Sequence, residues 1–259
     1  MLKAFFSSAT GMRAQELLID NTANNLANVN TSGFKAKKIN FADLIYDTIN
    51  RPGAAAGNGT VRPIGLEIGS GTRAVGTTSI YSQGTPTETE IRTHMAIEGD
   101  GFFRVLRGTQ TAYTRDGSFV RNDVGQLATG DGYLLDPPIT IPPNAENISI
   151  SQAGTVSFVV DGTPTEAGQI QLARFPNPEG LQNVGNNLLI ESGASGAEVL
   201  GTAGEDGLGL LRQGFIEGSN VEVVSELVSL ITAQRAYEIN SRAIRAGDEM
   251  LSTASDIVR

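Results

Sequence analysis

The sequence holds few side chains that could carry out catalysis. His94 is the single histidine among 259 residues, and there is no cysteine. Zinc sites use several His or Cys ligands, and a nucleophilic centre needs a base beside its nucleophile. Neither arrangement is visible around His94. We therefore predict no metal site, no cofactor and no enzymatic activity, and we interpret His94 as an ordinary surface or core residue.

Two glycine-containing segments have the residue types of ligand-binding loops without their spacing. Gly99-Asp100-Gly101 begins like a dinucleotide-binding loop, but Arg104 replaces the third glycine and no helical pattern follows. Glu205-Asp206-Gly207 lacks the alternating oxygen ligands of a calcium loop. We interpret both segments as turns. The sequence does not show whether the fold brings two carboxylates together, as glycan cleavage requires. A cell-wall glycan-binding or glycan-cleaving β protein is therefore kept as an alternative.

Charge is unevenly distributed along the chain. The net charge is −9 overall, with +3 in residues 1–40, −10 in residues 41–220 and −2 in residues 221–259. An acidic body argues against a nucleic-acid partner, which requires a basic face. We interpret the basic cluster near the N-terminus as a solvated turn. It consists of Lys35, Lys37 and Lys38.

The apolar segments are short. No stretch reaches the ~18 apolar residues that a membrane span requires. Ser7, Ser8 and Thr10 interrupt the apolar residues near the N-terminus, so we do not expect a cleaved secretion signal. Export from the cytoplasm would then need another route.

A heptad pattern predicts a helix near the N-terminus, over residues 2–29. One row holds large side chains, namely Phe5, Met12, Ile19 and Leu26. The companion row is mostly small and consists of Leu2, Ala9, Glu16 and Ala23. Asparagines are poor helix formers and glycine often follows a helix end, so the Asn-rich stretch before Gly33 should end the helix.

A second heptad pattern predicts a helix of about ten turns at the other end of the sequence. Ser219 with Glu222 three residues later has the form of a capping box and should start it. The large row consists of Leu230, Tyr237, Ile244, Leu251 and Val258. The companion row consists of Ala233, Asn240, Gly247 and Ala254. Small residues on one row let a partner helix approach closely.

The two patterns together predict that the terminal helices pair as a coiled coil, with the two large rows forming an assembly interface. We assign residues 1–33 and 219–259 to this terminal-helix domain. Residues 34–75 are predicted to form an extended connecting segment, because Arg51–Gly71 is rich in glycine and proline.

The middle of the chain, residues 76–218, shows β patterns. Ile148 and Ile150 alternate before a turn at Gln152-Ala153-Gly154, and the alternation then resumes from Val156. Asp-Gly pairs, which favour tight turns, recur along this part of the chain. Residues 113–120 are predicted to form one hairpin around Asp116-Gly117. The expected class is α+β, with a mainly antiparallel β domain between two long helices.

Three segments of this chain resemble the sequence motifs of bacterial flagellar rod and hook proteins, in the same order and over nearly the whole length. The first is Asn24-Asn25-Leu26-Ala27-Asn28-Val29-Asn30-Thr31-Ser32-Gly33-Phe34-Lys35. The second comprises Ala96–Phe103 and Tyr113–Phe119. The third comprises Ser219-Asn220-Val221 and Gln234-Arg235-Ala236-Tyr237-Glu238-Ile239-Asn240.

The resemblance implies a structural subunit that polymerises with copies of itself. The terminal helices would form the inner tube of a stiff helical shaft, and the β domain its outer wall. The implied partners are the proximal rod proteins, the hook protein, the P- and L-ring bushings and the flagellar type III export apparatus. The implied location is the periplasm-spanning rod of the basal body.

Within the family, the length and two local segments are similar to those of the distal-rod member. These segments are Gly65–Gly71 and Leu210–Glu217, in which Arg212 stands where the resemblance would place a tyrosine. A proximal-rod paralogue of similar length is the alternative within the family.

Overall fold

The computed structural model describes residues 2–53 and 63–257, and Val258 of the predicted large row lies outside these ranges. The chain forms two compact units. Unit 1 comprises Met1–Leu26, Lys37–Thr78 and Glu222–Arg259, and unit 2 comprises Ala27–Ala36 and Ser79–Val221. The predicted α+β class is confirmed, with a helix toward each end and mostly antiparallel strands between them.

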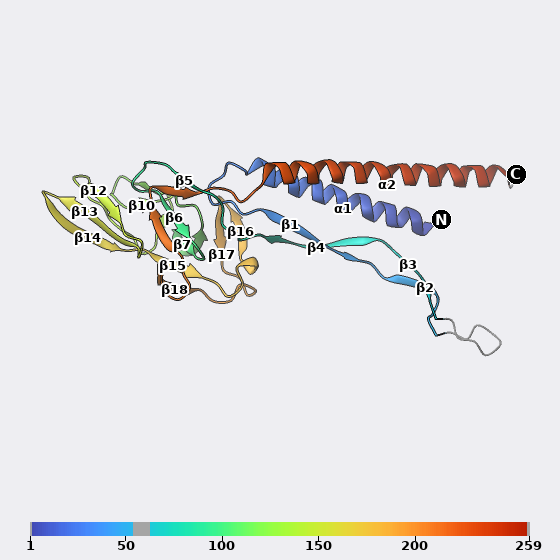
Figure 1. The fold of residues 1–259 in the computed structure, drawn as a ribbon, viewed down its shortest axis with the longest axis horizontal. Coiled ribbons are helices and arrows are strands. Elements are labelled where there is room, and N and C mark those ends of the chain that lie inside the picture. Colours follow the sequence, from blue (N-terminus) through green and yellow to red (C-terminus); the bar gives the residue numbers. More distant parts are fainter. Residues whose placement is uncertain (1, 54–62, 258–259) are drawn as a thin grey trace. The chain divides into compact units, whose positions relative to one another are not determined.

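Unit 1 contains both helices, α1 (Leu2–Ala27) and α2 (Val223–Ile257), which are drawn in blue and red in Figure 1. The predicted first helix is confirmed to within two residues of its end. It stops in the Asn-rich stretch, where the Thr31 amide donates to the Asn28 carbonyl in a turn. Gly33 follows with φ of +69°, a conformation that favours glycine.

The predicted capping box at the start of α2 is wrong. The helix begins at Val223, and its first bond joins the Glu226 amide to the Glu222 carbonyl. The Ser219 hydroxyl accepts instead from the Val221 amide. The reason lies in Asn220, whose side chain bonds to backbone groups of unit 2 and thereby holds residues 219–221 outside the helix.

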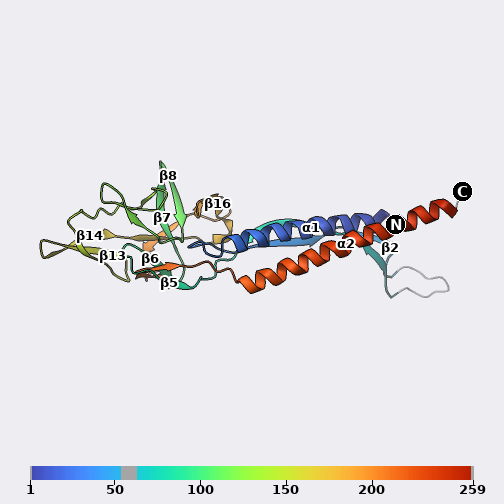
Figure 2. The same ribbon diagram turned by 90° about the horizontal axis from the view of Figure 1, so that it is seen from above.

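The two helices are antiparallel neighbours within unit 1, as Figures 1 and 2 show. A Cβ atom on Gly247 would lie 2.7 Å from the Phe5 ring, and one on Gly11 would lie 3.1 Å from the Asn240 side chain. Near the end of α1, Asn25 donates to a Glu226 side-chain oxygen at 3.1 Å. Residues near the start of α1 contact the later part of α2, and residues near the end of α1 contact its beginning. The two helices are therefore antiparallel.

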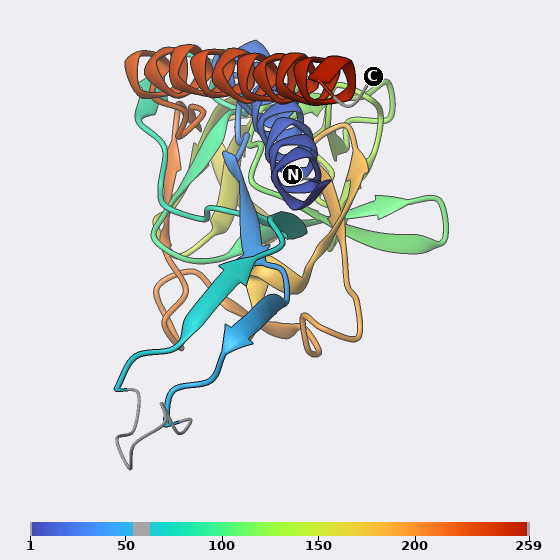
Figure 3. The ribbon, with the colours of Figure 1, turned by 90° about the vertical axis from the view of Figure 1, so that its right-hand side faces the viewer.

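The segment predicted as an extended connection forms two antiparallel strand pairs. Strand β1 (Lys37–Asp43) pairs with β4 (Thr72–Ser79), and β2 (Tyr46–Asn50) pairs with β3 (Leu66–Gly69). The β2–β3 register places Tyr46 opposite Gly69. Figure 3 shows β2 and β3 side by side in blue and cyan. Two-stranded ribbons bury little surface, and several large apolar side chains of this ribbon are exposed.

Unit 2 is built from β5 to β20. Its largest sheet follows the order β16-β17-β8-β7-β11-β10-β9, with β15 beside β7 and β18 beside β15. The strands of this sheet are β7 (Phe102–Arg107), β8 (Gln110–Thr114), β9 (Val120–Arg121), β10 (Leu127–Ala128), β11 (Leu134–Leu135), β15 (Gln171–Arg174), β16 (Gln182–Gly185), β17 (Leu188–Ile190) and β18 (Val199–Thr202).

Three smaller sheets complete unit 2. They are the meander β12-β13-β14, the pair β6–β19 and the pair β5–β20. Their strands are β5 (Pro86–Glu88), β6 (Met95–Glu98), β12 (Glu146–Ile150), β13 (Thr155–Val160), β14 (Thr163–Gln169), β19 (Leu210–Gln213) and β20 (Phe215–Glu217), and a short 3-10 helix, η1, spans Pro178–Gly180.

Unit 2 encloses a hydrophobic core. Phe103 and Phe119 are fully buried and their rings meet edge to face, with 5.1 Å between centroids. Apolar side chains from β6, β10, β15 and β19 also belong to the core, and they include Met95, Ile97, Leu127, Leu172 and Leu211. Such interlocking apolar packing stabilises a domain independently of partners.

The predicted β patterns have mixed outcomes. The turn at Gln152-Ala153-Gly154 is confirmed and joins β12 to β13. The Asp161-Gly162 pair joins β13 to β14 with φ of +50° and +81°, as a tight hairpin turn requires.

The predicted hairpin over residues 113–120 is wrong. Strand β8 pairs with β7 and β17, while β9 pairs with β10. The intervening loop is held by another strand, because the Met95 amide donates to the Gly117 carbonyl at 3.0 Å. Burial of Phe119 in the core then directs the chain away from β8.

Candidate functional site: a buried ionic junction in unit 2

A fully buried carboxylate lies where residues of all three sequence motifs meet. Glu217 is 0% exposed, and its Oε1 atom accepts hydrogen bonds from Lys35 Nζ at 2.6 Å and from the Gly84 amide at 2.9 Å. Its Oε2 atom forms an ion pair with Arg115 Nε at 3.2 Å, without hydrogen-bond geometry. We call the side chains of Lys35, Arg115, Glu217 and Asn220 the ionic junction.

Backbone contacts bring Lys35 to Glu217. Glu217 is the last residue of β20 and lies opposite Pro86 of β5. Its carbonyl accepts from the Gly33 amide at 2.7 Å, which fixes the loop that carries Lys35. A Cβ atom on Gly33 would lie 2.5 Å from the Asp116 amide nitrogen, so the close approach requires glycine at this position.

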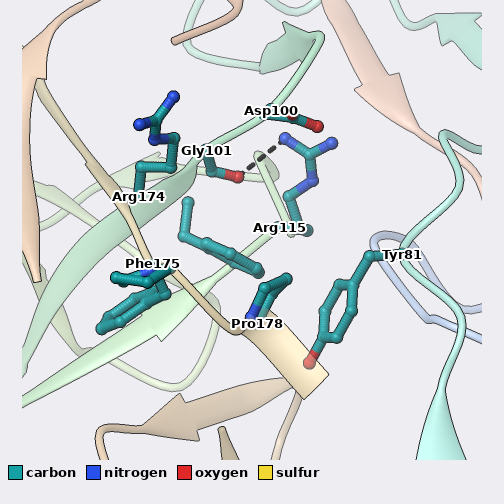
Figure 4. Close-up of a pocket in the computed structure, with 9 residues that line it drawn as sticks. Tyr81, Asp100, Gly101, Arg115, Arg174, Phe175 and Pro178 are labelled. Carbon is teal, nitrogen blue, oxygen red and sulfur yellow. Dashed lines mark hydrogen bonds between the residues drawn. The ribbon is translucent and has the colours of Figure 1, made fainter. Parts of the chain in front are cut away.

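Arg115 joins the junction to the turn between β6 and β7. Its guanidinium donates to the carbonyls of Gly99 and Gly101, each at 2.7 Å. Figure 4 shows the guanidinium directed at the Gly101 carbonyl, with the Asp100 side chain nearby. Residues 99–101, predicted to be a turn rather than a dinucleotide loop, are thus confirmed as a turn that binds an arginine of the same chain.

Asn220 extends the junction through its side-chain amide. Its Oδ1 atom accepts from the Ala36 amide at 2.7 Å, and its Nδ2 atom donates to the carbonyls of Ile80 at 2.7 Å and Ser82 at 3.1 Å. The Ile80 amide in turn donates to the Ala36 carbonyl, and Lys35 Nζ donates to the Ser82 carbonyl.

These bonds involve residues near three of the four points at which the chain passes between unit 2 and unit 1. The chain passes between the units after residues 26, 36, 78 and 221. Residues 33–36, 80–84 and 217–220 supply the groups that bond one another in the junction. The unit 2 ends of the passages after residues 36, 78 and 221 are therefore held in one polar cluster.

The junction contains two cations and one carboxylate. Burial lowers the pKa of Lys35, and the hydrogen bond and charge of Glu217 oppose this shift. Burial also lowers the pKa of Arg115, against the charges of Glu217 and Asp100. Each buried cation is thus stabilised by the Glu217 carboxylate and by backbone carbonyl groups that accept its hydrogen bonds. Removal of one partner would leave a buried charge without compensation, which is strongly unfavourable.

The prediction of a solvated turn at the basic cluster is wrong for Lys35, which is 7% exposed. Lys38 is exposed as predicted. At Lys37 the backbone carbonyl accepts from Asn21 and Asn25 of α1. Sequence reasoning missed the junction because Glu217 lies 182 residues from Lys35, and no local pattern links them.

The remaining motif residues are divided between the units. Thr22 and Asn25 of α1 are buried, and Asn25 Oδ1 accepts from the Lys37 amide at 2.9 Å within unit 1. The motif segment of α2, residues 234–240, is mostly exposed. Arg212, the departure from the family pattern, lies over the Phe215 ring with 3.8 Å to its centroid, so a cation–π contact occupies this position.

The structure places the predicted large rows at the flanks of the helix contact. Phe5, Met12, Ile19, Leu26, Leu230 and Ile244 are half-buried, while Tyr237 and Leu251 are exposed. The companion row of α2 lies deeper, since Ala233 and Gly247 are buried. In α1 the companion-row residues Ala9, Glu16 and Ala23 are exposed, and Ala14 is buried instead.

Unit 1 exposes large apolar side chains along both helices and the strand ribbon. Val224, Leu227, Val228 and Ile231 form an exposed stripe at helical spacing on α2, and Val224 is 68% exposed. On the ribbon, Ile45 is 85% exposed. Extended apolar patches of this kind mark interaction surfaces.

A pocket of about 310 Å³ lies beside the junction within unit 2 (Figure 4). It is lined by Tyr81, Asp100, Gly101, Phe102, Arg115, Arg174, Phe175, Pro176 and Pro178. Asp100 is the one carboxylate of this lining, whereas glycan cleavage uses two.

The remaining candidates for a functional role are His94, a metal site and a membrane-spanning helix. His94 Nδ1 lies 3.0 Å from the Thr89 hydroxyl, and burial lowers the pKa of His94 against the charge of Asp116. Within the described residues, no cluster of three or more His, Asp or Glu side chains could hold a metal ion. No helix in the described ranges is long and apolar enough to cross a membrane.

Three family models match this chain. Residues 7–35 match the "Flagella basal body rod protein" model, residues 96–158 match "Flagellar hook protein FlgE/F/G D1 domain", and residues 212–257 match "Flagellar basal body rod FlgEFG protein C-terminal". The three matched ranges contain the first, second and third sequence motifs in full.

Whole-chain relatives carry similar descriptions. The flagellar basal-body rod protein FlgG of Caulobacter vibrioides is 46% identical, with 99% of each chain covered. That of Borreliella burgdorferi is also 46% identical with full coverage of both chains, and that of Bacillus subtilis is 38% identical with full coverage. The chain therefore belongs to the flagellar hook and basal-body rod protein family, as a structural subunit of the rod.

Proposed function

We propose that this chain is a subunit of the flagellar distal rod, polymerising into a stiff helical tube that transmits motor torque to the hook. The observation that carries this proposal is the contrast in burial. Within the described residues of unit 1, the buried hydrophobic side chains are Ala14 and Ala233, while the exposed ones include Phe6, Ile231 and Ile239. A unit of this kind becomes well packed only when neighbouring copies cover it.

In the polymer, residues 1–33 and 219–259 form the inner tube and residues 76–218 the outer wall, with residues 34–75 connecting them. The terminal helices pair as a coiled coil within each subunit, and their flanking large rows meet neighbouring subunits. Support comes from the small residues at the helix contact, because Gly11 and Gly247 allow side chains of the other helix to approach closely.

The partners follow from the same proposal. One end of the polymer joins the proximal rod proteins and the other joins the hook protein, and the wall passes through the P- and L-ring bushings. The subunit reaches the periplasm through the flagellar type III export apparatus. The full-length similarity to basal-body rod proteins supports this placement.

Polymerisation is tested with the purified full-length chain at rising concentration. Electron microscopy should show straight filaments above a critical concentration, and sedimentation should show monomers below it. A protein that stays monomeric at all concentrations, in the presence of preformed hook–basal-body ends as seeds, would contradict the proposal. Restoration of hooks in a strain without its own distal rod protein, but not in one without a proximal rod protein, distinguishes the distal assignment from the paralogue.

The coiled-coil pairing has a test of its own, because the chain holds no cysteine. Cysteines at Gly11 and Asn240 should form a disulfide under mild oxidation, since a Cβ on Gly11 lies near the Asn240 side chain. Cysteines at Ala9 and Asn240 are the matched control, because Ala9 is exposed. Equal cross-linking of both variants would count against a fixed helix pair.

A further inference from the structure

The ionic junction has a property that core packing does not explain. Unit 2 already has a closed hydrophobic core around Phe103 and Phe119, and the junction lies near three of the four points at which the chain enters or leaves this unit. Buried ion pairs are often no more stabilising than apolar residues of the same volume. In some proteins buried charged or polar groups instead specify a single geometry, because each buried charge requires its partner at a fixed place.

We propose that Glu217 is a positioning residue that clamps the unit 2 ends of three chain passages, those after residues 36, 78 and 221, into a single arrangement. Its carboxylate binds Lys35 and the Gly84 amide, and its carbonyl binds the Gly33 amide. One residue thus contacts the segment after α1 and the segment after β4, and it lies six residues before the start of α2 at Val223. The proposal deepens the proposed torque-transmitting role and rests on it for its cellular consequence.

The geometry makes the clamp interdependent. Lys35 Nζ bridges Glu217 and the Ser82 carbonyl, and Asn220 bridges Ala36 to Ile80 and Ser82. Loss of the Glu217 charge leaves Lys35 and Arg115 as two buried cations that repel each other. The loop of residues 33–36 is the element that can release this repulsion, because Arg115 stays bound to the carbonyls of Gly99 and Gly101.

The test is native-state hydrogen exchange on the full-length Glu217→Gln variant, which keeps the shape of the side chain and removes its charge. Exchange at the amides of Gly33, Ala36 and Gly84 should accelerate at least tenfold, while amides of β7 and β8 exchange as in the parent. Glu198→Gln is the matched control. Glu198 also forms an ion pair and a hydrogen bond in unit 2, with Arg104 and Tyr113, but touches none of the passages.

Two outcomes would overturn the proposal. Unchanged exchange at Gly33 and Ala36 would show that Glu217 does not hold the loop. Equal acceleration in β7 and β8 would show a general stabilising role. If Glu217→Gln does not fold, Lys35→Met provides the same readout, and the Lys35→Met/Glu217→Gln double variant should exchange more slowly at Gly33 than Glu217→Gln because one of the repelling cations is gone.

An experiment in cells distinguishes a failure of this inference from a failure of the proposed function. In a strain that depends on the variant, hooks should form at the parental number, while swimming speed in viscous medium falls at least twofold. The Glu198→Gln strain should match the parent in both. Absence of hooks in the strain carrying the parent chain would contradict the proposed function, whereas normal speed of Glu217→Gln cells with accelerated exchange would contradict the positioning role alone.

Discussion

Unit 1 and unit 2 bury apolar side chains in opposite ways. Unit 2 buries large residues such as Phe103, Met95 and Leu172 completely, in one continuous core. In the described part of unit 1 the buried hydrophobic residues are alanines, and Ile and Leu side chains of α2 and the ribbon are exposed. The contrast shows that unit 2 has a closed apolar core that can stabilise it without partners, whereas the described part of unit 1 has none. Unit 1 is complete only when other surfaces cover it.

The largest effect that should follow from this contrast concerns Ile244, which is half-buried in the middle of α2. Ile244→Asp places a carboxylate in the proposed seam, and an unpaired buried charge costs ~3–5 kcal/mol. The critical concentration for polymerisation should rise more than about 100-fold, because each ~1.4 kcal/mol is a factor of ten. Sedimentation and electron microscopy measure it, while the melting transition of unit 2 should stay unchanged.

Arg245→Asp is the control for charge. Arg245 is exposed and its guanidinium bonds to Ser241 on the same helix, so its replacement should weaken assembly much less. If Ile244→Asp polymerises as well as the parent, the large row of α2 is not the assembly interface and the comparison between the units loses its functional meaning.

The second prediction needs no mutation. In the dilute monomer, amides of α1 and α2 should exchange at least about 100-fold faster than those of β7 and β8, because helices without a full apolar cover are marginal in water. In the polymer the helix amides should become protected. Hydrogen exchange with mass spectrometry measures both states. Strong protection of residues 5–26 and 225–253 in a confirmed monomer would show that unit 1 is stable alone.

The third prediction tests unit 2. Phe103→Ala removes a fully buried ring that packs on Phe119, and such a change costs ~3–5 kcal/mol. For a unit of this size the melting temperature should fall by about 10 °C. Circular dichroism of the β signal measures it. Phe6→Ala is the matched control, because Phe6 is 58% exposed and its loss should leave the melt unchanged.

The smallest expected effect is a pH dependence of unit 2 from His94. Burial lowers the pKa of His94 in the folded chain, so the unfolded chain binds the proton more readily. The stability linked to this group is therefore fully present above about pH 6.5 and declines as the pH falls through the lower folded value. Asp116 opposes the shift and keeps the effect small. His94→Gln should flatten the melting temperature between about pH 7 and pH 5, and an unchanged slope would assign the dependence to other groups.

Sequence reasoning found the elements whose signals are local. Both long helices and the Asp161-Gly162 hairpin follow from spacing and turn chemistry that a short window contains. The heptad rows of α2 were found as well. Their depth in the structure could not be found, because a heptad pattern fixes which residues share a face but not how that face is rotated toward its neighbour.

The errors have a common physical cause, which is bonding between segments far apart in the sequence. The capping box fails because Asn220 binds Ile80 and Ala36, and the hairpin at Asp116-Gly117 fails because Gly117 binds Met95. Lys35 was taken for a solvated residue because its partner Glu217 has no local signal. From its chemistry alone a lysine is expected to be exposed to water. The acceptors that allow Lys35 to be buried, the Glu217 carboxylate and the Ser82 carbonyl, are brought to it only by the complete fold.

The long sequence separation between Lys35 and Glu217 also determines when the junction can form during folding. During synthesis or threading from the N-terminus, the loop that carries Lys35 emerges 182 residues before the carboxylate that binds it. Contacts between distant residues form late, because closing a long loop costs entropy before the contact is gained. The junction therefore stays open in every chain that stops short of residue 217. A truncated subunit could still fold its early hairpins, but it would lack Glu217 and Asn220, so the fold distinguishes finished from unfinished chains.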